Sequence, residues 1–290
     1  MLARLGAILF PVFAIVAVGY FYGRRHRPEM AVANRLNMDV FVPALVFSAM
    51  AEQSHQIGTL GPLALGALAV VLGSGLAAWP VARWLRVDAK TFVPPMMFNN
   101  SGNIGLPVAL LAWGEAAMPA AVIMFMVENT LHFSLGLRLL DPNARLLQLW
   151  RVPVVAATLL GLAAAFSGIH LWPPLMTAAR MLGQISIPLL LFGLGVRMTG
   201  VSFHDWRIGV AGAVLRPLAG IALAWLAVRG LELTGERAAM LIVFGALPPA
   251  LLNFLFAERY GQEPERVASL VLIGNLAALV FLPVTLFAVL

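Results

Sequence analysis

The sequence predicts an all-helical membrane protein whose ten spans form two related halves of five. Of its 290 residues, 61% are hydrophobic and only 11% are charged, whereas soluble domains usually carry about 25% charged residues. Apolar stretches recur along the whole chain, with brief polar breaks between them. Several short motifs also recur in the same order, 141 to 146 residues after their first appearance. These observations indicate a polytopic membrane protein with an internal repeat.

Each predicted span is an apolar stretch close to the roughly 20 residues that a helix needs to cross a bilayer. Almost no basic residues precede the first span and no clear cleavage site follows it, so we expect it to be retained rather than removed as a signal peptide. The second span is short, and the repeat supports its inclusion. The predicted spans are residues 4–23, 36–51, 60–82, 91–113, 117–139, 149–169, 176–197, 206–228, 237–257 and 267–290.

Basic residues between the spans predict the orientation. Counted over alternate breaks, fourteen Lys and Arg residues fall on one side and four on the other. Since basic loops favour the cytoplasm, both termini are predicted to face outward from the inner (plasma) membrane. The same pattern explains the net charge of +6 without nucleic-acid binding. The chain has no cysteine, which excludes disulfides, thiol catalysis and thiolate metal sites.

The internal repeat predicts two five-span units, residues 1–140 and 149–290. Its clearest matches pair residues 106–111 with 247–252, residues 42–47 with 187–192, and Asn129 with Asn275. Because five is odd, the second unit is inverted relative to the first. Inverted repeats place a binding site at their interface, built from discontinuous helices.

A polar run interrupts the fourth span at residues 99–107, Asn-Asn-Ser-Gly-Asn-Ile-Gly-Leu-Pro. Such backbone is tolerated at membrane depth only where it is buried in protein or lines a wet cavity, and secondary transporters bind cargo with broken helices of this kind. The alternative is a packing kink, but packing needs small residues and not three amides. The candidate substrate-binding residues here are Asn99, Asn100, Ser101, Asn103, Gly105 and Pro107.

The repeat predicts a second broken helix in the ninth span, at residues 245–249. Pro248 and Pro249 have no backbone N–H, so they leave carbonyls near residues 244–245 without helical partners. Those carbonyls could line the site or bind a cation, or the prolines could simply kink the helix. Both prolines are candidate site residues, and Asn253, one turn further along, is a weaker one.

Few ionisable residues lie inside the predicted spans. Glu128 is the only acid well inside one, and Asn129 and His132 follow it. A carboxyl and an imidazole one turn apart could couple transport to H⁺ or Na⁺, or a neutral Glu128 could make a helix contact. Asn275, the counterpart of Asn129, is predicted to face the same cavity. Arg216 is the only cation at depth, and it could neutralise a carboxylate substrate, pair with Glu128 or snorkel to an interface.

Residues 100–107 resemble the signature of the auxin efflux carrier family, and the segment from residue 247 through Tyr260-Gly261 to Pro283 resembles that family's C-terminal end. The resemblance covers nearly the whole chain. It implies a fold shared with bile-acid/sodium symporters, in which the fourth and ninth spans cross at their broken centres. Spans 3–5 and 8–10 would form a moving transport domain, and spans 1, 2, 6 and 7 a scaffold that is often dimeric.

The resemblance also implies a function. Bacterial members resemble permeases for small carboxylates such as malonate or malate, and this chain resembles their short prokaryotic form because it lacks the long central loop of the long plant carriers. The resulting hypothesis is a secondary transporter for a small organic anion, working by elevator-type alternating access without a cofactor or resident metal. A channel is the alternative. An intramembrane enzyme is less favoured, because the sequence lacks Gly-x-Ser-Gly, His-Glu-x-x-His and paired intramembrane aspartates.

Overall fold

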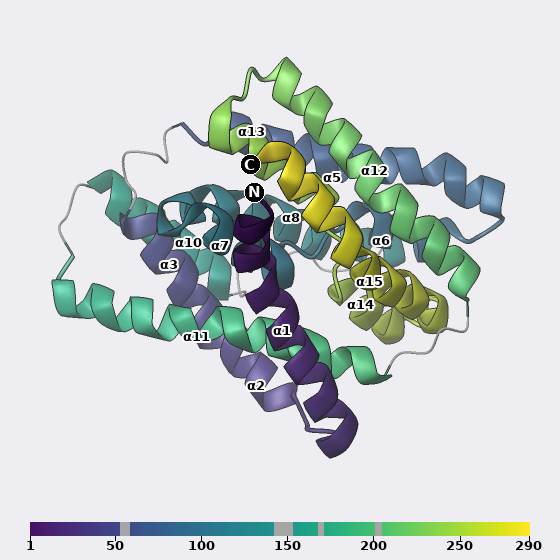
Figure 1. Ribbon diagram of the computed structural model, residues 1–290, viewed down its shortest axis with the longest axis horizontal. Helices are drawn as coiled ribbons and strands as arrows, with labels where there is room; N and C mark the ends of the chain where they lie inside the picture. Colours follow the sequence, from purple (N-terminus) through teal and green to yellow (C-terminus); the bar gives the residue numbers. More distant parts are fainter. Residues whose placement is uncertain (53–58, 142–152, 168–170, 201–204) are drawn as a thin grey trace.

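The computed structural model describes the chain except for residues 53–58, 142–152, 168–170 and 201–204. Within the described residues, the regular structure is helical apart from one isolated β-bridge (Figure 1). Six helices in this part of the chain are long and apolar enough to cross a membrane, as expected for a multi-pass membrane protein. They cover Ala3–His26, Gly61–Leu85, Glu115–Leu140, Pro173–Arg197, Trp206–Gly230 and Pro264–Val289.

The helices follow one another with short connections in both predicted halves. The first half contains α1 (Leu2–His26), α2 (Ala31–Leu36), the π-helical turn η1 (Asn37–Phe41), α3 (Val42–Glu52), α5 (Gly61–Leu85), α6 (Ala89–Met97), the π-helical turn η2 (Ser101–Gly105), α7 (Leu106–Trp113), the 3₁₀ turn η3 (Glu115–Ala117), α8 (Met118–Leu131), the π-helical turn η4 (His132–Gly136) and α9 (Leu137–Leu140). The second half contains α10 (Pro153–Ser167), α11 (Pro173–Arg197), the 3₁₀ turn η6 (Met198–Gly200), α12 (Trp206–Gly230), α13 (Gly235–Ala246), α14 (Leu252–Tyr260) and α15 (Pro264–Val289).

Four predicted spans differ from single uninterrupted α-helices. The fifth is a succession of α8, η4 and α9. The second is a succession of α2, η1 and α3, and it begins earlier than the predicted residue 36. The fourth and ninth are each divided into two helices. Both ends of the sixth predicted span, and most of the junction between the two halves, lie outside the described residues.

The break in the fourth span is shorter than the polar run that predicted it. α6 ends at Met97, the chain is non-helical only at residues 98–100, and η2 begins at Ser101. The N–H groups of Ile104 and Gly105 both donate to the carbonyl of Asn100 (3.1 Å), which closes the first new turn. Most of residues 99–107 therefore lie at the start of a helix. The glycines and polar side chains of the run allow the helix to be interrupted, but they are also compatible with helical backbone.

The break in the ninth span falls close to its predicted position. α13 ends at Ala246 and α14 begins at Leu252, so the non-helical segment is residues 247–251, against a prediction of 245–249. Pro248 and Pro249 occupy its centre, where neither can donate the hydrogen bond that would continue the helix.

The two breaks lie against each other as short extended segments. Asn99 and Pro249 form an isolated antiparallel β-bridge. The N–H of Asn100 donates to the carbonyl of Pro248 (2.8 Å), and the N–H of Ala250 donates to the carbonyl of Phe98 (2.9 Å). Unpaired backbone groups are costly in a membrane, so each break supplies partners that the other lacks.

Helix contacts divide the described elements into two groups (Figure 1). In one group, α1 packs on α11, and α3 packs on both α10 and α11. In the other, α12 packs on α5, α13 and α15, while α5 packs on α6 and α8. The two broken helices belong to the second group. α7 also contacts α1 and η2 contacts α11, and a cavity lies between the two groups beside these contacts.

Candidate functional site

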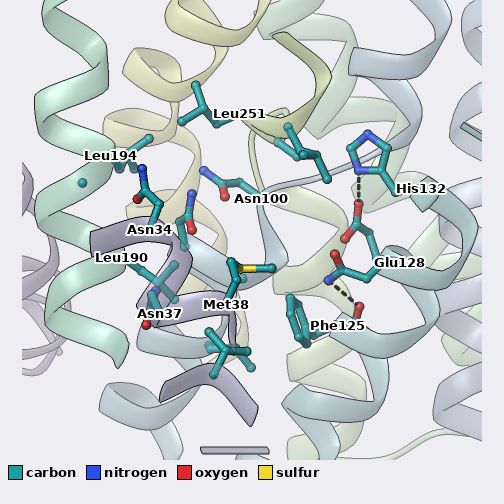
Figure 2. Close-up of a pocket in the computed structure, with 18 of the residues that line it drawn as sticks. Asn34, Asn37, Met38, Asn100, Phe125, Glu128, His132, Leu190, Leu194 and Leu251 are labelled. Atoms are coloured by element: carbon teal, nitrogen blue, oxygen red, sulfur yellow. Dashed lines mark hydrogen bonds and ion pairs between the residues drawn. The ribbon is translucent and has the colours of Figure 1, made fainter. Parts of the chain in front are cut away.

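A cavity of about 180 Å³, called here the central cavity, lies beside the two breaks (Figure 2). One water needs only about 10–15 Å³ by this measure, so the space admits a small molecule. η1 and α11 supply one wall, and α8 and η4 supply the opposite wall. Six asparagines line it and provide hydrogen-bonding groups: Asn34, Asn37, Asn99, Asn100, Asn103 and Asn129.

Two helix N-termini open into the central cavity. The helix formed by η2 and α7 begins at Ser101, and Gly102 and Asn103 line the cavity. α14 begins at Leu252, which also lines the cavity. The first N–H groups of a helix have no acceptor in their own helix and carry partial positive charge. At the start of α14 the N–H groups of Asn253 and Phe254 already donate to the carbonyls of Ala250 and Leu251, so the partial charge of that end acts mainly through the helix dipole. Both ends favour a negatively charged group between them.

The carbonyls freed by the two prolines of the ninth span already have donors. In a continuous helix, residues 248 and 249 would donate to the carbonyls of Phe244 and Gly245. Instead, Nδ2 of Asn99 donates to the Phe244 oxygen (2.8 Å) and Nη1 of Arg216 donates to the Gly245 oxygen (3.0 Å). The Phe244 oxygen also accepts a longer hydrogen bond from the N–H of Leu247 (3.4 Å), so both carbonyls have donors within the protein.

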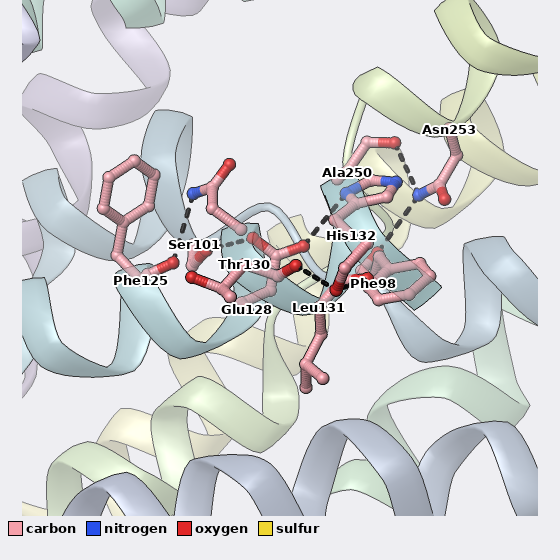
Figure 3. A network of polar contacts seen from close by, with 11 residues as sticks. Phe98, Ser101, Phe125, Glu128, Thr130, Leu131, His132, Ala250 and Asn253 are labelled. Carbon is pink, nitrogen blue, oxygen red and sulfur yellow. Dashed lines mark hydrogen bonds and ion pairs between the residues drawn. The ribbon is translucent and has the colours of Figure 1, made fainter. Parts of the chain in front are cut away.

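The end of α6 is capped in a similar way. Nδ2 of Asn253 donates to the carbonyl of Phe98 (3.1 Å) and to that of Ala250 (2.9 Å) (Figure 3). Asn99 thus caps the ninth-span break and Asn253 caps the fourth-span break. At both breaks, the negative end of a half-helix meets protein donors, whereas the positive end of the next half-helix faces the cavity.

Arg216 lies on α12, behind the ninth-span break. Its side chain is fully buried, so it does not snorkel to an interface. Among the described residues it makes no ion pair with Glu128, and it does not line the central cavity. Gly220 and Gly245 bring α12 and α13 into close backbone contact beside it, because a Cβ on Gly220 would overlap the Gly245 carbonyl.

Asn275 braces the fourth-span break from α15. Its Oδ1 accepts a hydrogen bond from Nδ2 of Asn100 (3.1 Å). Its own Nδ2 donates to the carbonyls of Pro249 (3.0 Å) and Val271 (2.8 Å). Asn275 therefore links the two breaks, but it does not line the cavity as the sequence predicted.

Glu128 is the centre of a buried polar network on the cavity wall (Figure 3). Oγ of Ser101 donates to its Oε2 (3.1 Å), and Nδ1 of His132 lies 3.1 Å from its Oε1. The imidazole stacks on the ring of Phe98, with centroids 4.1 Å apart. Nε2 of His132 has no hydrogen-bond partner in the described part of the chain. The carboxyl is thus connected directly to the start of η2.

All three π-helical turns of the described residues contribute to the central cavity. η1 contributes Asn37 and Met38, η2 contributes Asn103, and η4 contributes His132 and Phe133. Such turns are rare overall, but those that occur are often found at functional sites. The extra residue in the turn changes the direction of the side chains relative to a regular helix.

The structure places the predicted site residues in two layers. The central cavity is lined by Asn99, Asn100, Asn103, Glu128, Asn129 and His132. Behind it lie Ser101, Pro248, Pro249, Asn253, Asn275 and Arg216, which hold the breaks and the lining residues. Two others face away from it: Gly105 contacts the Leu247 side chain, and Pro107 is buried in the first turn of α7.

Sequence reasoning missed the wall opposite Glu128. Asn34 and Asn37 lie three residues apart on α2 and η1, and Arg197 ends α11. The i, i+3 spacing of the two asparagines was a usable signal, because it places both on one helix face. Arg197 was treated only as an orienting charge at a span end, and nothing in its local sequence indicates a cavity.

Comparisons with known proteins identify the family of the chain. The chain matches the family described as membrane transport protein over residues 7–148 and 143–286. It is 24% identical to the "Uncharacterized transporter YfdV" of Escherichia coli K12, over 87% of each chain. It is 25% identical to the "Putative malonate transporter" of Rhizobium meliloti, over 95% of this chain and 92% of the relative.

A plant protein matches part of the chain. The "Probable auxin efflux carrier component 5b" of Oryza sativa is 30% identical over 46% of this chain and 38% of its own length. The family match covers most of this chain, and the named relatives are transporters rather than enzymes. The chain therefore belongs to the membrane transport protein family that includes the auxin efflux carriers, as a short prokaryotic member.

Proposed function

We propose that this membrane transporter is a secondary carrier for a small organic anion, a mono- or dicarboxylate, which binds in the central cavity. One observation carries the proposal: two helix N-termini face the cavity, while the carbonyls freed at the breaks already have protein donors. This arrangement favours negative over positive charge. The name of the Rhizobium relative, a malonate transporter, supports a carboxylate.

Within this proposal, the cavity-facing amides bind the carboxylate oxygens. Asn100 is fixed by Asn275, and Asn103 stands in the first turn of the new helix. Asn99 lines the cavity and its amide nitrogen holds the ninth-span break, while Asn253 and Arg216 hold the two breaks from behind. A carboxylate would accept hydrogen bonds from the amides and the first-turn N–H groups together.

We further propose that the chain has ten spans in a five-plus-five inverted repeat, with its fourth and ninth spans crossing at their breaks. The paired extended segments at Asn99 and Pro249 support the crossing. The two groups of packed helices support a scaffold of spans 1, 2, 6 and 7 and a transport domain of spans 3–5 and 8–10. An elevator-like movement of one group past the other would expose the cavity to each side of the inner membrane in turn. Both termini would face outward, and a homodimer would form through the scaffold.

We also propose that the network of Glu128 and His132 couples transport to H⁺ or Na⁺. Asn129, beside this network on the cavity wall, and Asn275, on the opposite side of the break, belong to the same proposed coupling site. A buried carboxyl in direct contact with the substrate-binding helix can link its own charge state to anion binding.

Uptake by proteoliposomes tests the proposed function. The purified protein is reconstituted and offered radiolabelled malonate, malate, succinate and acetate, with and without pH and sodium gradients. Saturable uptake of at least one anion is expected, and Asn103→Ala should raise its KM. No uptake of any of these anions would contradict the proposal, and flux that never saturates would indicate a channel.

A further inference from the structure

A second cavity, of about 230 Å³, lies between α3, α11 and the turn at η3. Its wall includes Arg180, near the start of α11, whereas Arg197, at the end of the same helix, lines the central cavity. Seventeen helical residues separate the two arginines, which corresponds to roughly 25 Å along the axis. The two cavities therefore lie toward opposite ends of one membrane-spanning helix.

The internal repeat relates the walls of these two cavities. Adding 145 to the numbers of five residues of the second cavity gives residues that line the central cavity, and 145 is also the offset between residues 42–47 and 187–192. These five are Leu45, Ser48, Ala49, Glu52 and Leu110, whereas Glu115 and Met118 have no such counterpart. The clearest pairs are Leu45 with Leu190, Ala49 with Leu194, and Glu52 with Arg197. On the facing wall, Leu110 and Leu251 match at the offset of 141 that relates 106–111 to 247–252. The second cavity is thus the repeat counterpart of the central cavity.

The two cavities differ in the state of their arginines. In the second cavity, Nη2 of Arg180 lies 2.5 Å from Oε1 of Glu52, and Glu115 lines the same space. In the central cavity, Arg197 has no acidic partner within ion-pair distance among the described residues. The acid of that cavity, Glu128, is bound instead by Ser101 and His132. Within the described part of the chain, the repeat-related cavities therefore present an arginine without an acidic partner at one end and an arginine paired with Glu52 at the other.

We propose that the second cavity is the other access site for the transported anion, and that Glu52 weakens anion binding there by neutralising Arg180. This inference rests on the proposed function. A carboxylate arriving from the Arg197 end meets an uncompensated guanidinium. One arriving from the Arg180 end must compete with a carboxylate of the protein for the same donors. The carrier consequently has a lower KM at its Arg197 end than at its Arg180 end.

The absence of cysteine from the chain makes the two ends separately measurable. Leu45→Cys and Leu190→Cys are matched substitutions that place a single thiol in the second and the central cavity, respectively. In proteoliposomes, a bulky membrane-impermeant thiol reagent then inactivates the molecules whose tagged cavity faces outward. The remaining molecules transport in one known orientation, so the KM for [14C]malonate can be measured from each end.

The decisive variant is Glu52→Gln, which should improve transport rather than impair it. It is expected to lower the malonate KM at the Arg180 end by about threefold to tenfold, in line with the modest strength of partly exposed ion pairs. The KM at the Arg197 end should not change. A gain of this kind cannot result from misfolding. Adding Arg180→Gln should abolish the gain, and Glu258→Gln, an exposed acid outside both cavities, should change neither KM.

An unchanged KM at the Arg180 end in Glu52→Gln, or an equal fall at both ends, would overturn the inference while leaving the proposed function intact. If another carboxylate of the uptake experiment is transported in place of malonate, that anion serves as the probe. If none is transported, the proposed function fails and the inference fails with it.

Discussion

The fourth-span and ninth-span breaks create the same backbone problem and solve it with different residues. The fourth-span break contains polar side chains, and its own Asn99 reaches across to cap the other helix. The ninth-span break contains two prolines and little polarity, so its freed carbonyls depend on donors from the fourth and eighth predicted spans. Each break is therefore stable only because the other parts of the structure complete it.

The two halves of the chain also contribute different kinds of groups to the central cavity. The first half of the chain supplies Asn100, Asn103, Glu128 and His132 to the cavity, whereas the second half supplies mainly leucines, the N-terminus of α14 and one charged side chain, that of Arg197. The two breaks thus share an extended backbone geometry although most of the polar side chains come from the first half. Four sets of substitutions test this comparison, taken from the largest expected effect to the smallest.

The close contact between α12 and the ninth-span break should be the feature that is most sensitive to substitution. Gly220→Ala places a Cβ against the Gly245 carbonyl and the Arg216 guanidinium, and overpacking of this kind costs about 3 kcal/mol. We expect a clear fall in the thermal unfolding midpoint in detergent and loss of uptake. Gly230→Ala, on the same helix with open space around it, is the matched control. Equal behaviour of the two variants would contradict the role assigned to this contact.

The cap that Asn99 forms across the two breaks should contribute about 1–2 kcal/mol to the free energy of unfolding. Asn99→Ala leaves the Phe244 carbonyl with only the long hydrogen bond from the N–H of Leu247 (3.4 Å), and the loss of a buried hydrogen bond costs this much. Pro248→Ala restores a backbone N–H that can bond to the same carbonyl. In a double-mutant cycle followed by thermal unfolding, Asn99→Ala should therefore cost less in the Pro248→Ala background. Strictly additive effects would mean that the two residues do not share this acceptor.

Two asparagines distinguish substrate binding from support. Asn103 lines the cavity, and the described residues show no hydrogen bond from its side chain, whereas Asn253 caps the Phe98 carbonyl. Asn103→Ala should raise the KM for the transported anion by about fivefold to tenfold, because a change of this size corresponds to the loss of roughly one hydrogen bond to a charged group. Its thermal unfolding midpoint should stay unchanged. Asn253→Ala should lower that midpoint by the equivalent of about 1 kcal/mol, and the reverse pattern would exchange the two roles.

Glu128→Gln should have the smallest effect on stability, because the amide keeps the size of the side chain and can still accept from Ser101. Its expected effect is on coupling. Uptake by the wild-type protein should respond to an imposed proton or sodium gradient, and that response should disappear in Glu128→Gln. Asp141→Asn, a variant beyond the end of α9, serves as the charge control. A full response to the gradient in Glu128→Gln would remove Glu128 from the coupling site.

Much of this arrangement could be predicted from the sequence, because it depends on local chemistry. Prolines that cannot donate predicted the ninth-span break, and an acid and a histidine one turn apart predicted the pair at Glu128 and His132. What could not be predicted depends on tertiary packing. The fourth-span break is three residues long because Asn100 pairs with Pro248, and Arg197 lines the cavity because α11 packs against η1. Arg216 is unusual in the sequence as a cation inside a span, but its acceptor, the carbonyl of Gly245 that Pro249 leaves free, could be identified only in three dimensions.

The position of a bound anion tests the central claim most directly. Crystals of the protein soaked with bromomalonate, after uptake assays have shown that it competes with the transported carboxylate, would locate the bromine by its anomalous scattering. The proposed function predicts a peak in the central cavity, between the start of η2, the start of α14 and Arg197, that disappears when excess malonate is added. A malonate-sensitive peak elsewhere, or no peak at all in protein that transports the compound, would contradict the assignment of the site.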